Sequence, residues 1–334
     1  IAYMEFHAEL FPKALIRKIT HRHNLLLVGS CFTEQIGNKL LQHKFCVLDN
    51  PNGILFNPVS IARAINSYTA GRLYEAADLF FDNELWGSWD HHTRFSSIDC
   101  QTALNNINES QQRASAFIKK ADWILLTLGS AFVYEQVSVE NKGGYEQVVA
   151  NCHKVPADKF NRRLLDISEI KTELVKMIAK VKQVNPAAQF IFTISPVRHL
   201  REGFIENNRS KSALIQAVHS LVNDEDVFYF PAYELVIDDL RDYRFYAEDL
   251  VHPNYAATNY VWEKFKLTCI DEQAQQLMKE LAVIMAARNH KPFNPLSEQH
   301  KKFLQANLEK IKVLQKQHPY LNLDSAERYF STGG

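Results

Sequence analysis

The apolar stretch Asn24-Leu25-Leu26-Leu27-Val28 runs directly into Gly29-Ser30-Cys31-Phe32, and a segment of helical periodicity, 33–42, follows. A short, unbroken apolar run that ends in glycine is typical of a strand covered on both faces, as parallel sheets require. In such sheets ligands bind at the carboxyl ends of the strands. The stretch therefore predicts an α/β protein with Ser30 where chemistry can take place, although a buried structural serine or a helix N-cap fits the same position.

The alternation of short apolar runs and longer amphipathic segments continues along the chain. Apolar residues three and four apart indicate helices with one buried face. Strands that alternate with such helices are typical of a parallel sheet with crossover connections, so we expect a three-layer α/β/α sandwich. The expected strands are 25–28, 46–48, 123–128, 190–194 and 227–230, and the expected helices are 33–42, 59–68, 104–120, 159–184, 210–222 and 255–267.

Two segments depart from this alternation. Asn141-Lys142-Gly143-Gly144 separates the β-favouring runs 132–139 and 145–149 and predicts a hairpin that projects from the sheet. Residues 272–334 are charged and helix-forming, with Pro292 and Pro295 between two helical stretches. We expect a catalytic domain over 1–271 and a helical C-terminal extension over 272–334, which caps the core, pairs two subunits or covers the site.

The composition excludes several classes of protein. Lys plus Arg and Asp plus Glu both number 38, so no net charge attracts nucleic acid. The five cysteines are widely spaced and form no C-x-x-C pair, which argues against a zinc or redox centre and for a reducing compartment. Residues 1–12 lack the regions of a signal peptide, and no run approaches the ~18 apolar residues of a membrane helix. We expect a cytoplasmic protein without a cofactor that binds neither nucleic acid nor membrane; a leader removed before residue 1 is the alternative.

A second informative stretch lies far downstream, at Asp249-Leu250-Val251-His252-Pro253. A carboxylate three residues before a histidine in a turn can reach Nδ1 of the ring and leave Nε2 as a base. Pro253 makes the turn rigid, and Asn254 can cap the next helix. With Ser30 the pair predicts a Ser-His-Asp triad, and the alternative is a capping aspartate beside an incidental surface histidine.

Five motifs together resemble one known family. They are Gly29-Ser30-Cys31-Phe32, Asn52-Gly53, Leu128-Gly129-Ser130, Ser195-Pro196-Val197-Arg198-His199 and the run from Asp239 through Pro253. Over about residues 20 to 270 the chain resembles the GSCFA family, which is similar to SGNH (GDSL-like) esterases. The resemblance implies a flavodoxin-like α/β/α hydrolase fold in which Ser30 is the nucleophile and Asp249 and His252 complete the triad.

The chain departs from the esterase pattern at two positions. The esterase Gly-Asp-Ser is Gly-Ser-Cys here, so Cys31 is the alternative nucleophile, provided that it is accessible and its pKa is lowered. Gly129-Ser130 stands where the esterases carry Gly-x-Asn-Asp, whose Asn binds the oxyanion. We expect the oxyanion donors to be the N–H groups of Ser30, near a helix N-terminus, and Gly53, together with Ser130; Asn151-Cys152-His153 is a further source.

Aromatic and polar residues elsewhere suit a polar substrate. The loop 86–92 sets tryptophans beside histidines, a composition that fits a sugar, although rings that anchor the loop to the core explain it equally. His91 and His92 diverge as neighbours, so we expect no metal. Arg198 can fix a carboxylate or phosphate, or pair with a structural carboxylate. The expected substrate-binding residues are Asn52, Trp89, His91, His92, Asn151, His153 and Arg198.

The sequence therefore predicts a serine esterase that removes a small acyl group, with acetyl preferred, from a carbohydrate or similar polar substrate. Ser30 would attack the ester, His252 would take its proton and Asp249 would orient His252. Two alternatives use the same fold: an O-acyltransferase with the same triad, and a non-catalytic carbohydrate-binding module.

Overall fold

A five-stranded parallel sheet forms the centre of the structure, a computed structural model that describes residues 7–137 and 145–332. Its strands are β1 (Asn24–Gly29), β2 (Cys46–Asp49), β5 (Trp123–Leu128), β9 (Gln189–Ile194) and β10 (Val227–Tyr229). The strand order β10-β9-β5-β1-β2 places β5 in the middle, and all its residues are buried. All five strands agree with the sequence prediction to within one residue at each end.

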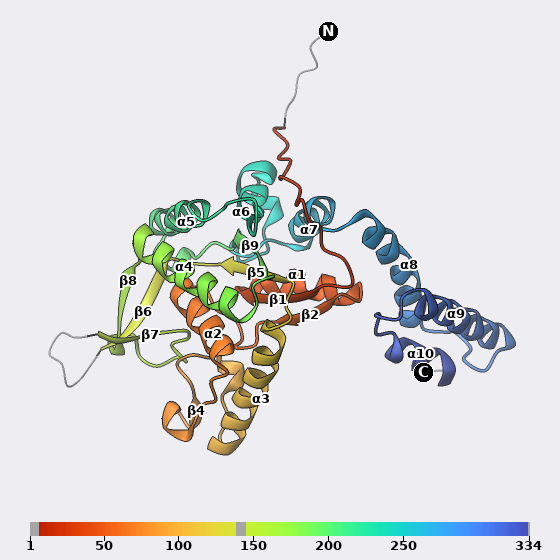
Figure 1. The fold of residues 1–334 in the computed structure, drawn as a ribbon, viewed down its shortest axis with the longest axis horizontal. Coiled ribbons are helices and arrows are strands. Elements are labelled where there is room, and N and C mark those ends of the chain that lie inside the picture. The colour runs from red at the N-terminus through yellow and green to blue at the C-terminus, as the bar shows by residue number, and fades with distance from the viewer. Residues whose placement is uncertain (1–6, 138–144, 333–334) are drawn as a thin grey trace, which may run out of the picture.

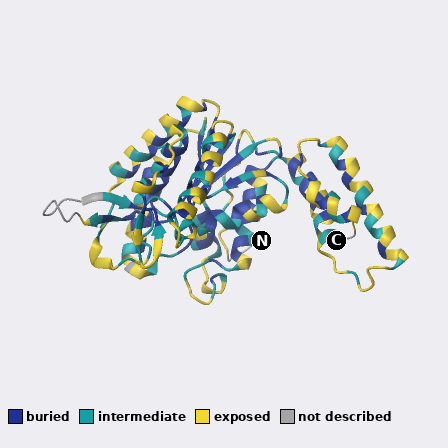
Figure 2. Ribbon diagram, turned by 90° about the horizontal axis from the view of Figure 1, so that it is seen from below, coloured by how far each residue is buried: buried dark blue, intermediate teal, exposed yellow. Residues whose placement is uncertain are grey.

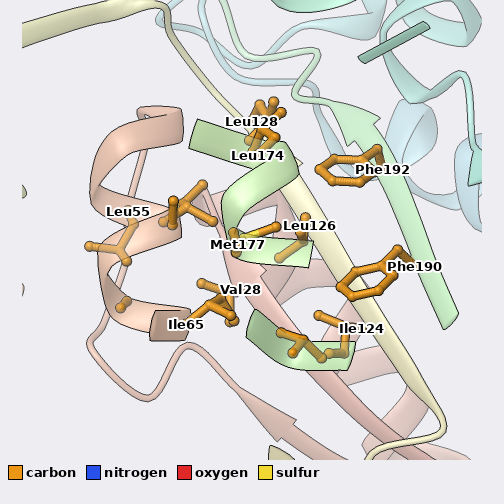
Figure 3. Close-up of a cluster of buried hydrophobic side chains, with 14 of the residues drawn as sticks. Val28, Leu55, Ile65, Ile124, Leu126, Leu128, Leu174, Met177, Phe190 and Phe192 are labelled. Carbon is orange, nitrogen blue, oxygen red and sulfur yellow. The ribbon is translucent and has the colours of Figure 1, made fainter. Parts of the chain in front are cut away.

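Helices cover both faces of the sheet. One face carries α2 (Pro58–Ala70), α3 (Cys100–Ile118), α4 (Ile167–Val184) and α5 (Phe204–His219), and the other carries α1 (Cys31–Gln42), α7 (Tyr255–Cys269) and the short α6 (Ala232–Glu234). Because successive strand residues point to opposite faces, Leu26 and Val28 enter the first core, part of which Figure 3 shows, whereas Leu25 and Leu27 enter the second. The predicted three-layer sandwich is confirmed (Figure 1).

A small antiparallel sheet stands beside the main one. It consists of β6 (Phe132–Val137), β7 (Tyr145–Val149) and β8 (Phe160–Leu164), in the order β7-β6-β8. The two flanks of the predicted hairpin pair as expected, while its turn, 141–144, lies outside the described residues. The helix predicted from residue 159 begins only at Ile167, because 160–164 pair with β6 and Asp166 and Glu169 form a capping box. A two-stranded ribbon, β3 (Phe80–Asp82) and β4 (Leu85–Gly87), was not predicted.

Three helices follow the sandwich and form the predicted helical extension (Figure 1). They are α8 (Glu272–Asn289), α9 (Glu298–Gln317) and α10 (Asp324–Thr332). Ala274 and Met278, near the start of α8, still pack against the sandwich, whereas Leu281 and Ile284 belong to a separate core shared with α9 and α10. The division into domains at residue 271 stays a prediction.

Burial follows the layers: strands are dark and helices expose one side (Figure 2). None of the helices formed by residues 7–137 and 145–332 combines the length and the apolar composition that crossing a membrane requires.

Candidate active site

The carboxyl end of β1 is built around a close approach to β5. Gly29 has φ 151°, and a Cβ atom there would lie 2.3 Å from the carbonyl oxygen of Thr127. Only glycine fits this position without displacing the backbone. The N–H of Gly29 donates to Oδ1 of Asn50 (2.8 Å), which fixes the chain as it leaves the strand.

Ser30 caps helix α1. Its Oγ accepts a hydrogen bond from the N–H of Phe32 (3.3 Å), its own N–H donates to the carbonyl of Thr127 (3.3 Å), and the residue is 0% exposed. This is the structural N-cap that the sequence left open as the alternative. The geometry gives the predicted nucleophile no surface that a substrate can reach.

Cys31, the first residue of α1, is partly exposed. Burial raises the pKa of its thiol, while the N–H groups of Phe32 and Cys31 itself and the charge of Lys211 act in the opposite direction. A helix N-terminus favours an anion. Of the two side chains at the end of β1, that of Cys31 is thus the accessible one, whereas that of Ser30 is buried.

Asp249 and His252 lie in the loop before α7 and are hydrogen-bonded as the spacing predicts. Oδ2 of Asp249 is 2.7 Å from Nδ1 of His252, and Oδ1 accepts the N–H groups of Val251 (2.9 Å) and His252 (3.0 Å). These bonds, first the backbone one from His252, lower the pKa of Asp249 to about 2. Nε2 of His252 has no hydrogen-bond partner among the described residues, and both side chains are about half-exposed. A carboxylate bound at Nδ1 fixes the orientation of the ring and leaves Nε2 directed away from the pair.

The loop that carries this pair is joined to the sheet. The N–H of Arg198, just after β9, donates to the carbonyl of Val251 (3.1 Å), and the N–H of Ala247 donates to that of His252 (2.8 Å). The guanidinium of Arg198 lies over the ring of Tyr246, 4.5 Å from its centroid. Arg198 therefore braces the loop that carries Asp249 and His252. Since β5 alone separates β1 from β9, the start of α1 and the loop that carries His252 both lie at the carboxyl edge of the sheet.

The expected oxyanion donors all have partners within the protein. The N–H of Gly53 donates to the carbonyl of Asn50 (2.7 Å), and that of Ser130 donates to Phe56 (3.0 Å). Oγ of Ser130 accepts the N–H of Phe132 (3.0 Å) and lies 3.3 Å from Oγ of Ser210. The N–H of Cys31 is different: among the described residues it has no acceptor beyond its own side chain.

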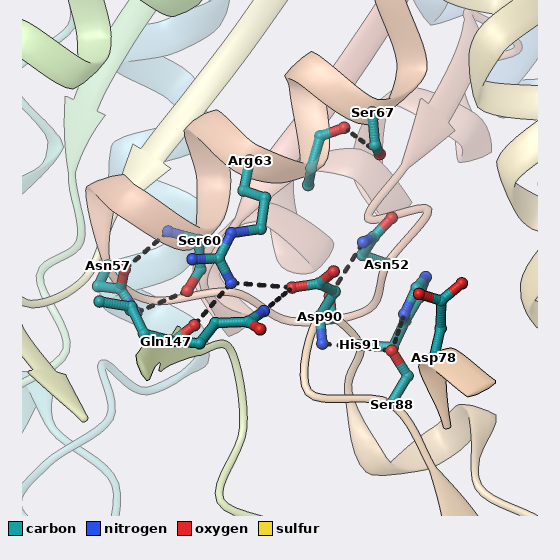
Figure 4. A network of polar contacts seen from close by, with 12 residues as sticks. Asn52, Asn57, Ser60, Arg63, Ser67, Asp78, Ser88, Asp90, His91 and Gln147 are labelled. Carbon is teal, nitrogen blue, oxygen red and sulfur yellow. Dashed lines mark hydrogen bonds and ion pairs between the residues drawn. The ribbon is translucent and has the colours of Figure 1, made fainter. Parts of the chain in front are cut away.

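Asn52 and His91 belong to a polar network that fastens the loop 86–92 (Figure 4). Nδ2 of Asn52 donates to the carbonyl of Asp90 (2.9 Å), and its Oδ1 accepts the hydroxyl of Tyr68 (2.7 Å). Asp90 pairs in turn with Arg63 (3.0 Å). His91 is buried against Oγ of Ser88 (2.9 Å), and burial lowers its pKa to about 4. Asn52 and His91, two of the residues expected to bind substrate, thus form their hydrogen bonds within the protein.

Trp89, His92 and His153 are also engaged within the protein. Trp89 stacks on Phe80 with ring centroids 3.7 Å apart and meets His153 edge-on. Nε2 of His153 lies 2.9 Å from the carbonyl of Ser88, and Nδ1 of His92 accepts the N–H of Arg94 (3.2 Å). The tryptophan therefore anchors the loop, the alternative that the sequence left open. Within the described residues no three His, Cys, Asp or Glu side chains gather as metal ligands.

Asn151 lines a pocket of about 280 Å³ beside the carboxyl end of β5. His199, which the sequence analysis did not single out as a site residue, lies in the same wall, and its buried Nε2 has no hydrogen-bond partner among the residues that the structure describes. Burial, and then the charges of Lys211 and His252, lower the pKa of His199 to about 3. The pocket is lined by Phe56, Asn57, Ser130, Phe132, Tyr134, Val149, Ala150, Asn151, Cys152, His199 and Arg201.

Lys211 of α5 is a second residue that sequence reasoning missed. Its Nζ donates to the carbonyls of Gly129 (2.6 Å) and Ser195 (2.7 Å), the residues that follow β5 and β9. The side chain is fully buried, and burial lowers its pKa to about 7. A signal existed in the sequence, because Lys211 shares a helical row with the apolar Leu214 and Val218 and so falls on the buried face.

Comparisons with known proteins identify the family. The GSCFA family model matches residues 24–265, and the model described as "GSCFA domain protein, C-terminal domain" matches residues 281–332. A solved structure, that of a carbohydrate esterase family 3 from Talaromyces cellulolyticus, aligns with a TM-score of 0.37 at 10% identity, over 77% of this chain and 99% of that chain. No curated protein matches significantly. With 24–265 matched, the chain belongs to the GSCFA family.

Proposed function

We propose that the protein is an esterase whose Asp249–His252 pair activates a nucleophile at the start of α1. The observation that carries the proposal is the 2.7 Å bond between the two side chains at the carboxyl edge of the sheet, with Nε2 of His252 unpartnered within residues 7–137 and 145–332. A carboxylate that holds imidazole in one tautomer is the arrangement that general-base catalysis needs.

The nucleophile in this proposal is Cys31, because Ser30 is 0% exposed and its oxygen caps α1. The thiol proton passes to Nε2 of His252, and Sγ bonds to the ester carbonyl carbon. The tetrahedral oxyanion collapses, the C–O bond breaks, and the leaving alkoxide takes the proton from His252. Water then gives a proton to His252 and attacks the thioester. The second tetrahedral intermediate releases the carboxylic acid, and the leaving thiolate takes the proton back from His252.

The oxyanion in this scheme lies at the N-terminus of α1, where the N–H of Cys31 has no acceptor elsewhere in the described residues. Helix N-termini stabilise developing negative charge. Removing one oxyanion donor costs other enzymes about 2.7 to 4 kcal/mol of barrier. The engagement of Gly53 and Ser130 within the protein thus favours a second candidate, a carbohydrate-binding module that does not turn over.

The pocket beside β5 supports a small polar substrate. Its volume of about 280 Å³ lies near the lower end of ligand sites, and it sets the rings of Phe56 and Phe132 beside Asn151 and His199. Rings offer a face to the apolar side of a sugar, and amide and imidazole nitrogens offer hydrogen bonds. We therefore propose a carbohydrate ester with a short acyl group, preferably acetyl, as the substrate.

The test is hydrolysis of p-nitrophenyl esters of increasing chain length by matched variants. Cys31→Ala and His252→Ala should each lose ~100-fold or more of the turnover, whereas Cys46→Ala, at an exposed cysteine, should match the wild type. Ser30→Ala should cost about 1 kcal/mol of stability as a lost N-cap and retain turnover per folded molecule. Turnover that survives in Cys31→Ala and vanishes in Ser30→Ala would restore the serine mechanism. No turnover in the wild type, with sugar binding intact, would favour the binding module.

A further inference from the structure

The pocket beside β5 has a single charged side chain in its described lining, and the charge is positive. Among the described residues that line it, Arg201 is the only member of the Asp, Glu, Lys and Arg set. Burial lowers the pKa of His199 to about 3 and raises the pKa of the Cys152 thiol, so both groups are neutral near pH 7. The described wall therefore offers a ligand one cation and no competing anion.

Arg201 has no partner within the part of the chain that the structure describes. It is exposed, and its guanidinium forms neither a hydrogen bond nor an ion pair there. Arg209, on the following helix α5, shows the opposite arrangement, because both carboxylate oxygens of Glu206 accept hydrogen bonds from it, at 3.0 and 2.9 Å. The five N–H donors of Arg201 thus remain available to a molecule in the pocket.

Other donors in the same wall also lack acceptors. Oδ1 of Asn151 accepts the N–H of His153 (2.7 Å), and Nδ2 of Asn151 has no acceptor among the described residues. The backbone N–H groups of Asn151 and Cys152 have none there either. The guanidinium of Arg162 lies over the ring of Phe132, 4.9 Å from its centroid, and adds positive charge beside the pocket. Unused donors and positive charge together favour an anion.

We propose that this pocket binds the anionic group of an acidic sugar and that Arg201 is the residue that selects it. A carboxylate or phosphate can accept two parallel hydrogen bonds from a guanidinium. The rings of Phe56 and Phe132 offer their faces to the apolar side of the sugar. The inference rests on the proposed function, to which it adds that the sugar of the substrate ester is negatively charged.

The experiment compares the dissociation constants of glucuronate, glucose 6-phosphate and glucose. The amide signals of Asn151 and Cys152 in ¹⁵N-labelled protein report both the affinity and the place of binding. Glucuronate should bind the wild type ~10-fold or more tightly than glucose, and Arg201→Gln should lose most of that difference. Arg201→Lys, which keeps the charge without the planar fork, should recover part of it. The matched control is Arg209→Gln, an exposed arginine outside the pocket lining, which should keep the wild-type preference. Tighter binding of glucose 6-phosphate than of glucuronate would support the inference and assign the anion as a phosphate.

Equal affinity of the wild type for the three sugars would overturn the inference, as would amide signals that none of them shifts. An anion preference that persists in Arg201→Gln would also refute it. The wild type gives a check that needs no variant: the preference should shrink as salt is added, because exposed charges are screened, and a preference that salt leaves unchanged contradicts the role of Arg201.

Release of acetate from acetylated glucuronate and acetylated glucose is scored separately from binding. An anion preference in binding without acetate release would defeat the proposed function and leave the inference standing. Acetate release without any preference for the anion would defeat the inference and leave the proposed function standing.

Discussion

Replacing Lys211 by methionine should change how stability depends on pH. Burial lowers the pKa of Lys211 from 10.5 to about 7, so across this window the unfolded chain holds a proton that the folded protein has released. The free energy of unfolding of the wild type therefore rises with pH from about 7 to 10.5. A difference of about 3.5 pH units amounts to about 5 kcal/mol, at ~1.36 kcal/mol for each unit.

Methionine has a similar length and no titratable group, so the variant lacks this dependence. It also leaves the carbonyls of Gly129 and Ser195 without their donor, at a cost of about 1 to 3 kcal/mol each, and this cost does not vary with pH. The difference in the free energy of unfolding between the wild type and Lys211→Met, called the offset below, is thus small near pH 7. The change of that offset, by up to about 5 kcal/mol in favour of the wild type as pH rises through the window, is the quantity predicted.

Urea unfolding followed by tryptophan fluorescence at pH 6, 7, 8 and 9 measures the offset. Lys264→Met is the control, because its ion pair with Glu9 raises the pKa of Lys264. A raised lysine pKa adds to the free energy of unfolding fully at every pH below 10.5, and this contribution is lost only above that pH. The difference in stability between the wild type and Lys264→Met should therefore stay constant from pH 6 to 9. A Lys211→Met offset that varies by less than about 0.5 kcal/mol between pH 6 and 9 would refute the buried-cation reasoning, since each unit in the window should add ~1.36 kcal/mol.

Three further outcomes are expected. Gly29→Ala should yield no folded protein, because its Cβ would meet the carbonyl oxygen of Thr127 at 2.3 Å; soluble yield and circular dichroism check this. The wild type should lose about 3 kcal/mol through His91 as pH falls from 6.5 to about 4, since the unfolded chain takes up the proton first, and His91→Phe should unfold in urea with a smaller loss over that range. Asp249→Asn should lower kcat/KM for p-nitrophenyl acetate ~100-fold or more with the melting temperature little changed, and a fall below 10-fold would contradict its role.

The central sheet was predictable because each of its strands can be identified from its own apolar composition, without knowledge of its neighbours. A run such as Trp123–Leu128 is apolar throughout, and burial on both faces demands that composition wherever the strand lies. The strand Phe160–Leu164 carries two arginines and no alternation, and it pairs because β6 lies beside it. Local sequence could not supply that partner, so the segment was assigned to the following helix.

The same distinction applies to the site. The contact of Asp249 with His252 spans three residues and follows from local turn geometry, so the spacing was enough to predict it. Lys211 and His199 acquire their environments from segments far away in the chain, and their chemistry comes from burial rather than from a motif. Ser30 shows the converse, since a motif drew attention to a hydroxyl whose contacts make it a helix cap.

Each residue of the motif Gly29-Ser30-Cys31-Phe32, for which the family is named, has a different environment in the structure. Gly29 permits the approach of β1 to β5, and Ser30 turns its oxygen inward to begin α1. Phe32 is buried in the core on that side of the sheet. Each of these three residues is fixed by a contact that leaves it no freedom to meet a ligand. Cys31 is the exception: it is partly exposed at the N-terminus of α1 and is therefore the residue of the motif that a ligand can reach.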